Sequence, residues 1–252
     1  MSISKKIGKS TPESEIHIER VFTENDPYSN IEFVKRSSVV RDLQGNTVGV
    51  SQEVIAPSHW SQIAVDILAQ RYLRKRGVPI QLEKIPEVGV PQFLWSSKAV
   101  IGSKTTCEND ARQVFHRLAG TWTYFGWKHN YFKTETNAQA FYDELLYILA
   151  KQIAAPNSPQ FFNTGIYWAY GINGPAQGHY RISDTGEIIK SSSAYEYPQP
   201  HACFIQSVKD TLLEKGGIFD LIKKEARIFK YGSGSGTNWS NVRGSGECLS
   251  GG

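Results

Sequence analysis

Residues 200–236, PHACFIQSVKDTLLEKGGIFDLIKKEARIFKYGSGSG, form the segment that decides the fold. The segment begins with an apolar, β-prone run from His201 to Val208, which predicts a strand. The run from Gly217 to Phe229 predicts an amphipathic helix, because its apolar residues share one face: Ile218, Leu221, Ile222, Ala226 and Phe229. A loop of closely spaced glycines, Gly232 to Gly236, follows. A strand that leads into a helix indicates an α/β region in the second half of the chain.

The first half of the chain is predicted to be mainly helical. Apolar residues recur at helical spacing over residues 58–77, where Ser58 is the predicted N-cap, and again over about 109–127 and 137–153. A short helical turn is expected over residues 158–164. A helix-rich first half followed by a mixed second half predicts a helical subdomain that leads into an α/β sheet or barrel.

Short strands and turns are predicted between these helices. Residues 31–34 and 39–40 are β-prone, and Gln44-Gly45-Asn46 is a turn signal before Val48 and Val50. Residues 180–190 predict a small hairpin, and Trp239 to Val242 predicts a short extended piece. We expect three regions: a flexible basic N-terminus over 1–30, a mainly helical subdomain over 31–155, and an α/β region over 156–252.

The composition excludes several classes of protein. The chain has 252 residues and 40% hydrophobic residues, enough to bury a core, so it is not disordered. Lys plus Arg exceeds Asp plus Glu by 28 − 24 = 4, which is modest for a nucleic-acid binder. The three cysteines, Cys107, Cys203 and Cys248, are too few for a secreted disulfide framework. With no signal peptide and no apolar run of about 20 residues, a cytoplasmic setting is expected.

The individual candidates for chemistry remain open between a structural and a functional interpretation. The glycines at 232–236 could let backbone N–H groups approach a phosphate, but their spacing fits neither a Walker loop nor a dinucleotide fingerprint. Cys203 in an apolar run is more often a small hydrophobe than a reactive thiol. Ser158 is more often a helix cap than an anion site, and Arg243 is more often solvated than phosphate-bound.

Five long blocks of the sequence stand out: WSQIAVDILAQRYLRKRGVP (60–79), VFHRLAGTWTYFGWK (114–128), APNSPQFFNTGIYWAYGINGPAQGHY (155–180), SAYEYPQPHACFIQSV (193–208) and EARIFKYGSGSGTNWSNVRGSGECLSGG (225–252). Together these blocks resemble the N-terminal part of the adenosylcobalamin-dependent (class II) ribonucleotide reductases. The similarity covers about residues 30–252, and the blocks stand in the family's order.

The resemblance implies an α/β fold in which the helical N-terminal subdomain is followed by the first part of a ten-stranded α/β barrel, left incomplete in this chain. It implies thiyl-radical reduction of ribonucleotides, as diphosphates, to the deoxyribonucleotides used in DNA replication. Cys203 matches one member of the family's redox-active cysteine pair, on the first barrel strand. Ser158, Ala202, Cys203 and Gly234 match positions that contact the substrate. We expect Cys203 to be a thiol buried at a strand end.

The resemblance also implies an allosteric site and several partners. Asp210, Thr211, Leu212 and Arg243 match positions that bind a deoxynucleoside triphosphate effector, and the helices of that site imply a homodimer. The implied cofactor is adenosylcobalamin, and the implied reductant is a thioredoxin-type protein. No metal ligand is predicted.

The family's radical cysteine, its second redox cysteine and most of its cobalamin site match nothing in this chain. We therefore expect the chain to act only with a downstream part, joined covalently, by splicing or non-covalently, and to be inactive alone. A non-catalytic module that senses nucleotides or supports assembly is the alternative.

Overall fold

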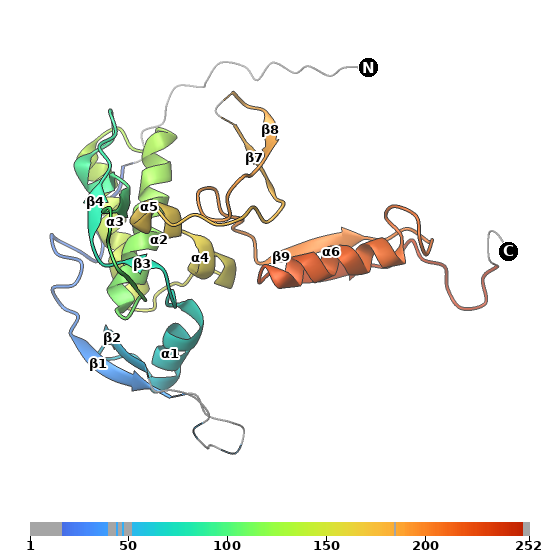
Figure 1. The fold of residues 1–252 in the computed structure, drawn as a ribbon, viewed down its shortest axis with the longest axis horizontal. Helices are drawn as coiled ribbons and strands as arrows, with labels where there is room; N and C mark the ends of the chain where they lie inside the picture. Colours follow the sequence, from blue (N-terminus) through green and yellow to red (C-terminus); the bar gives the residue numbers. More distant parts are fainter. Residues whose placement is uncertain (1–16, 40–43, 45–46, 48–51, 184, 249–252) are drawn as a thin grey trace.

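Helices α2 and α3 form the centre of the larger part of the structure (Figure 1). The structure is a computed structural model that describes residues 17–39, 44, 47, 52–183 and 185–248. Helix α2 spans Ala111–Lys128 and α3 spans Glu135–Ala150. Asp110 caps α2 in a reciprocal capping box with Gln113, which satisfies backbone N–H groups at the start of the helix. Both helices agree with the prediction from sequence.

The main apolar core lies where α2 and α3 meet a two-stranded sheet. Strands β1 (Phe33–Ser38) and β2 (Gln52–Pro57) pair antiparallel. The core combines buried side chains from these elements and from residues 62–72, including Val54, Val65, Leu68, Phe115, Leu118 and Leu146. The predicted turn between the strands lies largely outside the described residues, as do Val40, Val48, Val50 and residues 1–16. Within residues 17–30, Arg20 forms an ion pair with Asp143 of α3.

The long helix predicted over residues 58–77 is shorter and begins later. Helix α1 spans Gln62–Ile67 with Ser61, not Ser58, as its N-cap, and a π-helical turn continues over Leu68–Tyr72. The helix does not continue to residue 77, because the backbone at Arg74 forms hydrogen bonds outside the helix. The N–H of Arg74 donates to a carboxylate oxygen of Glu108 at 2.7 Å, and the N–H of Glu108 donates to the Arg74 carbonyl at 2.8 Å.

Between Val78 and Thr106 lie short strands that the sequence analysis did not predict. Strand β3 (Val78–Pro79) pairs with β6 (Thr105–Thr106), and β4 (Leu82–Lys84) pairs with β5 (Ser97–Ala99). A 3-10 turn at Gln92–Leu94 lies between β4 and β5. Strands of two or three residues carry too little alternation to be recognised from sequence.

Two short helices follow the core. Helix α4 spans Ser158–Asn163, as predicted, and α5 spans Ile166–Tyr170. Gly165 joins them with a φ of +83°, and a Cβ there would lie 2.1 Å from the Arg117 carbonyl oxygen of α2. Only glycine meets both demands. The predicted hairpin is confirmed as β7 (Tyr180–Ile182) and β8 (Ile188–Lys190).

The segment 200–238 forms an arm that projects from the larger part (Figure 1). Strand β9 (Cys203–Ser207), helix α6 (Ile218–Lys230) and strand β10 (Gly234–Asn238) make a β-α-β unit with parallel strands. The strand and the helix were predicted. The glycine loop was predicted wrongly, since its second half is β10. The extended piece at Trp239–Val242 is a turn, in which the Val242 N–H donates to the Trp239 carbonyl.

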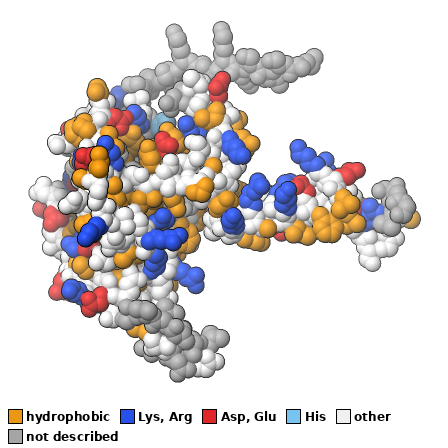
Figure 2. Space-filling view, viewed as in Figure 1, with side chains coloured by type: hydrophobic (Ala, Val, Ile, Leu, Met, Phe, Trp, Pro, Cys, Tyr) orange, Lys and Arg blue, Asp and Glu red, His pale blue; other side chains and the backbone are white. Residues whose placement is uncertain are grey.

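Each sheet among the described residues has two strands, and none closes into a barrel. The apolar face of α6 is therefore largely uncovered: Leu221 is buried, whereas Phe219, Ile222 and Phe229 are more than half exposed. Figure 2 shows hydrophobic side chains along one side of the arm, with Lys and Arg side chains on the other.

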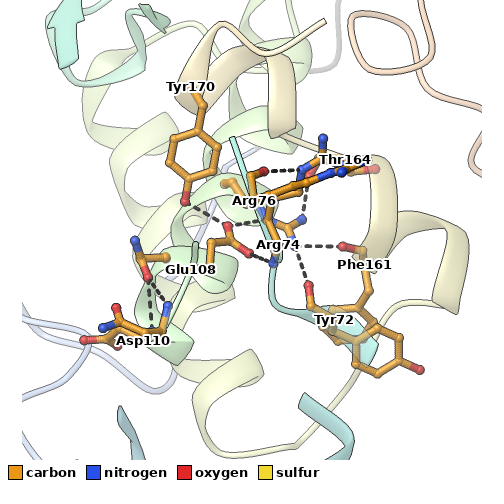
Figure 3. Close-up of polar contacts among 11 residues, drawn as sticks. Tyr72, Arg74, Arg76, Glu108, Asp110, Phe161, Thr164 and Tyr170 are labelled. Carbon is orange, nitrogen blue, oxygen red and sulfur yellow. Dashed lines mark hydrogen bonds and ion pairs between the residues drawn. The ribbon is translucent and has the colours of Figure 1, made fainter. Parts of the chain in front are cut away.

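A buried ion pair connects α2 to the segments on both sides of it (Figure 3). Arg117 and Glu108 are fully buried, and the Arg117 Nε donates to Glu108 at 2.9 Å. The two terminal nitrogens of Arg117 donate to three carbonyls, those of Thr164, Phe161 and Tyr72. Glu108 also accepts from the Tyr170 hydroxyl at 2.8 Å. A buried charge needs this degree of hydrogen bonding to be tolerated.

Replacing Arg117 by methionine should lower the free energy of unfolding by about 3–5 kcal/mol, because Glu108 would keep a buried charge without its partner. Arg112→Met on the same helix is the matched control: its ion pair with Asp110 is half exposed, and its loss should cost less than about 1 kcal/mol. Urea unfolding followed by tryptophan fluorescence measures both. Equal losses would contradict the role assigned to Arg117.

The His116 ring on α2 makes stability depend on pH. The ring lies against Trp168, and its Nδ1 is 2.6 Å from the Tyr142 hydroxyl. Burial lowers the pKa of His116 to about 4, and the positive charge of Lys84 acts in the same direction.

Because the folded pKa is depressed, the unfolded chain binds this proton first. Stability should be full above about pH 6.5 and should fall by at most about 3 kcal/mol as the pH drops towards 4. Urea midpoints of His116→Gln across that range should be flatter than those of the wild type. Parallel profiles would show that His116 does not carry the dependence.

Candidate functional site

Cys203 and Gly234 face each other at the first residues of β9 and β10. They are partners in the parallel register, and the Gly234 N–H donates to the Ala202 carbonyl at 2.5 Å. A Cβ on residue 234 would lie 3.3 Å from the Cys203 sulfur. Glycine therefore leaves the approach to the thiol uncovered by a neighbouring side chain, and the structure brings Ala202, Cys203 and Gly234 together as the resemblance implied.

The Cys203 side chain is a free, exposed thiol. The expectation of a buried thiol is thus wrong for the described residues. The physical reason is that Cys203 lies on a face of the β9–β10 pair that no described element covers, since Ile205 and Ser207 on the same face are exposed as well. An accessible thiol can form a disulfide by exchange, whereas a thiol enclosed in a core cannot.

Ser158 lies at the start of α4, but it is not the cap. Asn157 is the N-cap and accepts from the Gln160 N–H at 3.2 Å. The Asn157 amide also donates to the Pro200 carbonyl at 3.0 Å, which ties the start of α4 to the segment that leads into β9. The Ser158 hydroxyl is 3.1 Å from the Tyr72 hydroxyl. Neither Asn157 nor Tyr72 was predicted from the sequence as a site residue, because Asn157 resembles an ordinary loop residue and Tyr72 an ordinary residue of an apolar helix face.

Asp210 and Arg243 meet beyond the other ends of the same two strands. The Arg243 Nε donates to Asp210 at 2.6 Å, and its Nη1 donates to the Cys248 carbonyl at 3.2 Å. The carbonyls of Thr211 and Leu212 accept from the N–H groups of Ile218 and Phe219, so this loop folds back on the start of α6. The four predicted effector residues therefore lie at one end of the β-α-β unit.

Asp210 does not cap α6. The N-cap is Gly217, which makes no side-chain bond. Asp220 in the first turn accepts from the Gly216 N–H at 2.9 Å, and this bond, with Lys224, lowers the pKa of the Asp220 carboxyl. Asp210 is thereby available to pair with Arg243.

A cleft of about 1170 Å³ lies between α2, the β7–β8 hairpin and residues 197–204. Aromatic and basic side chains line much of it, among them Trp122, Phe125, His179, Arg181, Tyr197 and His201. The aromatic residues Trp168 and Tyr170 are buried in the core. Trp122 and Tyr124 instead line this cleft.

None of the described helices is long and apolar enough to cross a membrane. No group of three or more His, Cys, Asp or Glu side chains within the described part of the chain is arranged to bind a metal ion.

Comparison with known proteins agrees with the resemblance in the sequence. The family described as class II vitamin B12-dependent ribonucleotide reductase matches residues 34–152, and the ribonucleotide reductase barrel domain matches residues 201–252. A vitamin B12-dependent ribonucleotide reductase from Agrobacterium fabrum is 54% identical over 248 residues, which cover 94% of this chain and 20% of that protein.

Two further relatives carry the same name. The protein from Bradyrhizobium diazoefficiens is 54% identical over 239 residues (91% of this chain, 19% of the relative), and the one from Rhodopirellula baltica is 30% identical over 226 residues (90% and 19%). The chain thus spans about a fifth of the length of the curated relatives it matches.

The N-terminal family match, the barrel-domain match that follows it and the 54% identity agree: this chain belongs to the class II vitamin B12-dependent ribonucleotide reductase family, as an N-terminal portion of it.

Proposed function

We propose that this chain supplies part of the active site of a ribonucleoside-diphosphate reductase. The observation that carries the proposal is the exposed Cys203 thiol opposite Gly234. Cys203 and a second cysteine, in a part of the enzyme that this chain does not contain, would be the reductant. The ribonucleotide C2′ hydroxyl leaves as water and hydrogen takes its place, while the two thiols are oxidised to one disulfide. A thioredoxin-type dithiol then reduces that disulfide by exchange.

The described residues would act on the substrate side of this reaction. The Ser158 hydroxyl and the backbone at Ala202 and Gly234 would bind the ribonucleotide. Adenosylcobalamin, when bound, would supply the radical that starts the chemistry. The described residues fit a role beside the cofactor, because the Cys203 thiol at the start of β9 is exposed. We place most of the cofactor's own site in the remainder of the reductase.

The finer organisation of the chain also belongs to this proposal. Residues 31–155 would be a helical subdomain. Residues 156–252 would begin a ten-stranded α/β barrel, with β9 as its first strand. The barrel-domain match and the parallel pairing of β9 with β10 support this assignment. A cytoplasmic setting would keep the cysteines reduced.

Replacing Cys203 by serine in the assembled reductase should abolish multiple turnover while leaving folding intact, because the substitution is nearly isosteric. Cys107→Ser and Cys248→Ser are matched controls and should retain turnover. Deoxyribonucleotide formation with a dithiol reductant, measured by chromatography, separates these outcomes. Turnover that persists in Cys203→Ser would remove the redox assignment.

We further propose that Asp210, Thr211, Leu212 and Arg243 bind a deoxynucleoside triphosphate, in a homodimer formed through the helices of this site. The Asp210–Arg243 pair at 2.6 Å supports the assignment, since it holds a guanidinium beside the loop 210–212.

Arg243→Gln in the assembled reductase should weaken dTTP or dATP binding about 10–100-fold, the effect of losing a charged hydrogen bond. Calorimetry measures this affinity, and Lys230→Gln, an exposed cation on α6, is the control. Unchanged affinity in Arg243→Gln would contradict the effector site. Tight effector binding by the isolated chain would instead favour the alternative, a free-standing nucleotide-sensing module.

A further inference from the structure

A backbone hydrogen bond and the stacking of its ring together fix the position of Tyr72. It ends the π-helical turn Leu68–Tyr72, and its carbonyl accepts from the buried Arg117 at 3.1 Å. Its ring stacks on Phe161 of α4, with centroids 4.4 Å apart and an interplanar angle of 21°. Phe162 lies against the same ring at 5.4 Å. Both the backbone and the ring are therefore fixed, and so is the direction of the hydroxyl.

That hydroxyl points at Ser158. The two oxygens are 3.1 Å apart, and either could donate. A phenol is the better donor and an aliphatic hydroxyl the better acceptor, so we assign Tyr72 as donor. This assignment leaves the Ser158 proton free to donate to a ligand. Ser158 is only partly buried, so water could satisfy its hydroxyl in the absence of Tyr72.

The same arginine holds both partners of this hydrogen bond. Arg117 donates to the Tyr72 carbonyl and also to the carbonyls of Phe161 and Thr164 at the far end of α4. The distance between Tyr72 and the start of α4 is thus set by a side chain in the core. On the other side, Asn157 ties the start of α4 to Pro200, three residues before Cys203.

We propose that Tyr72 is a positioning residue for the ribonucleotide site: its hydroxyl orients Ser158 so that the Ser158 proton faces the bound substrate. The inference rests on the proposed function, in which Ser158 contacts the substrate. Phenylalanine at position 72 would keep the stack on Phe161 and the backbone bond to Arg117. It would remove only the orienting hydroxyl.

The test compares four forms of the assembled reductase: wild type, Tyr72→Phe, Ser158→Ala and the double variant. Tyr72→Phe should raise the KM for the ribonucleoside diphosphate, and its dissociation constant in equilibrium dialysis, roughly five-fold, as expected for one hydrogen bond. The kcat should stay within about two-fold, because the hydroxyl does not touch the reacting atoms. In the Ser158→Ala background, Tyr72→Phe should have no further effect.

Tyr142→Phe is the matched control. It also removes a partly buried phenol that is bonded to one side chain, the His116 Nδ1 at 2.6 Å, but away from α4. A rise in KM in Tyr72→Phe no larger than in Tyr142→Phe would overturn the proposal. So would additive effects of Tyr72→Phe and Ser158→Ala, or a loss of kcat without a change in KM.

The outcome for the proposed function can be distinguished from the outcome for Tyr72. If the wild type reduces ribonucleotides and Cys203→Ser does not, the reductase assignment stands whatever Tyr72→Phe does. If the wild type binds the diphosphate without reducing it, the binding cycle still decides the role of Tyr72. If the wild type does not bind it, both proposals are overturned.

Discussion

The Arg117 guanidinium holds together the part of the chain on which the candidate site depends. It lies in the middle of α2, in contact with segments that are far apart in sequence: Glu108 before the helix, Tyr72 after α1, and Phe161 and Thr164 around α4. Glu108 neutralises its charge and also binds the Arg74 backbone, which ends the π-helical turn. Apolar packing alone would not fix these backbones in direction, because hydrophobic contact is not directional. Hydrogen bonds to carbonyl oxygens are directional.

The arm formed by β9, α6 and β10 is under the opposite constraint, because it lacks most of its packing among the described residues. A parallel sheet is normally covered on both faces, and two strands alone are marginally stable in water. The exposed face of α6, with Phe219 and Phe229, and the exposed thiol of Cys203 have the same cause. Both are what the first β-α-β unit of a larger barrel would present before its neighbours are in place.

The sequence predicted the elements that carry a long, regular pattern. Helices α2, α3 and α6 have apolar residues at helical spacing over several turns, and β9 lies in a β-prone run. Prediction from the sequence failed where a contact with a residue far away in the chain determines the backbone conformation. The predicted helix over 58–77 ends early because Glu108 binds the backbone at Arg74. The glycines at 234 and 236 lie in a strand because β9 is available as a partner. Neither of these two contacts can be recognised from the local sequence pattern.

The candidate site shows the same division between local pattern and distant contact. The resemblance supplied Cys203, Ser158 and Gly234 by position, whereas Tyr72 required the structure. A tyrosine on the apolar side of a helix looks like a core residue. Only the meeting of the π-helical turn with α4 shows that its hydroxyl has a specific partner. Contacts of this kind join segments that are far apart in sequence: Tyr72 and Ser158 are separated by 86 residues.

The β-α-β unit also gives a physical route between the two proposed sites. Cys203 and Gly234 begin the paired strands, and Ser207 and Asn238 end them. Asp210 lies three residues after the end of β9, and Arg243 lies five residues after the end of β10. Four residue steps of a parallel strand span about 13 Å. A change in the Asp210–Arg243 pair on effector binding would therefore act on the two strands whose opposite ends hold the thiol. Because β9 and β10 are hydrogen bonded along their whole length, they would move together, and the register that sets Cys203 against Gly234 would be preserved.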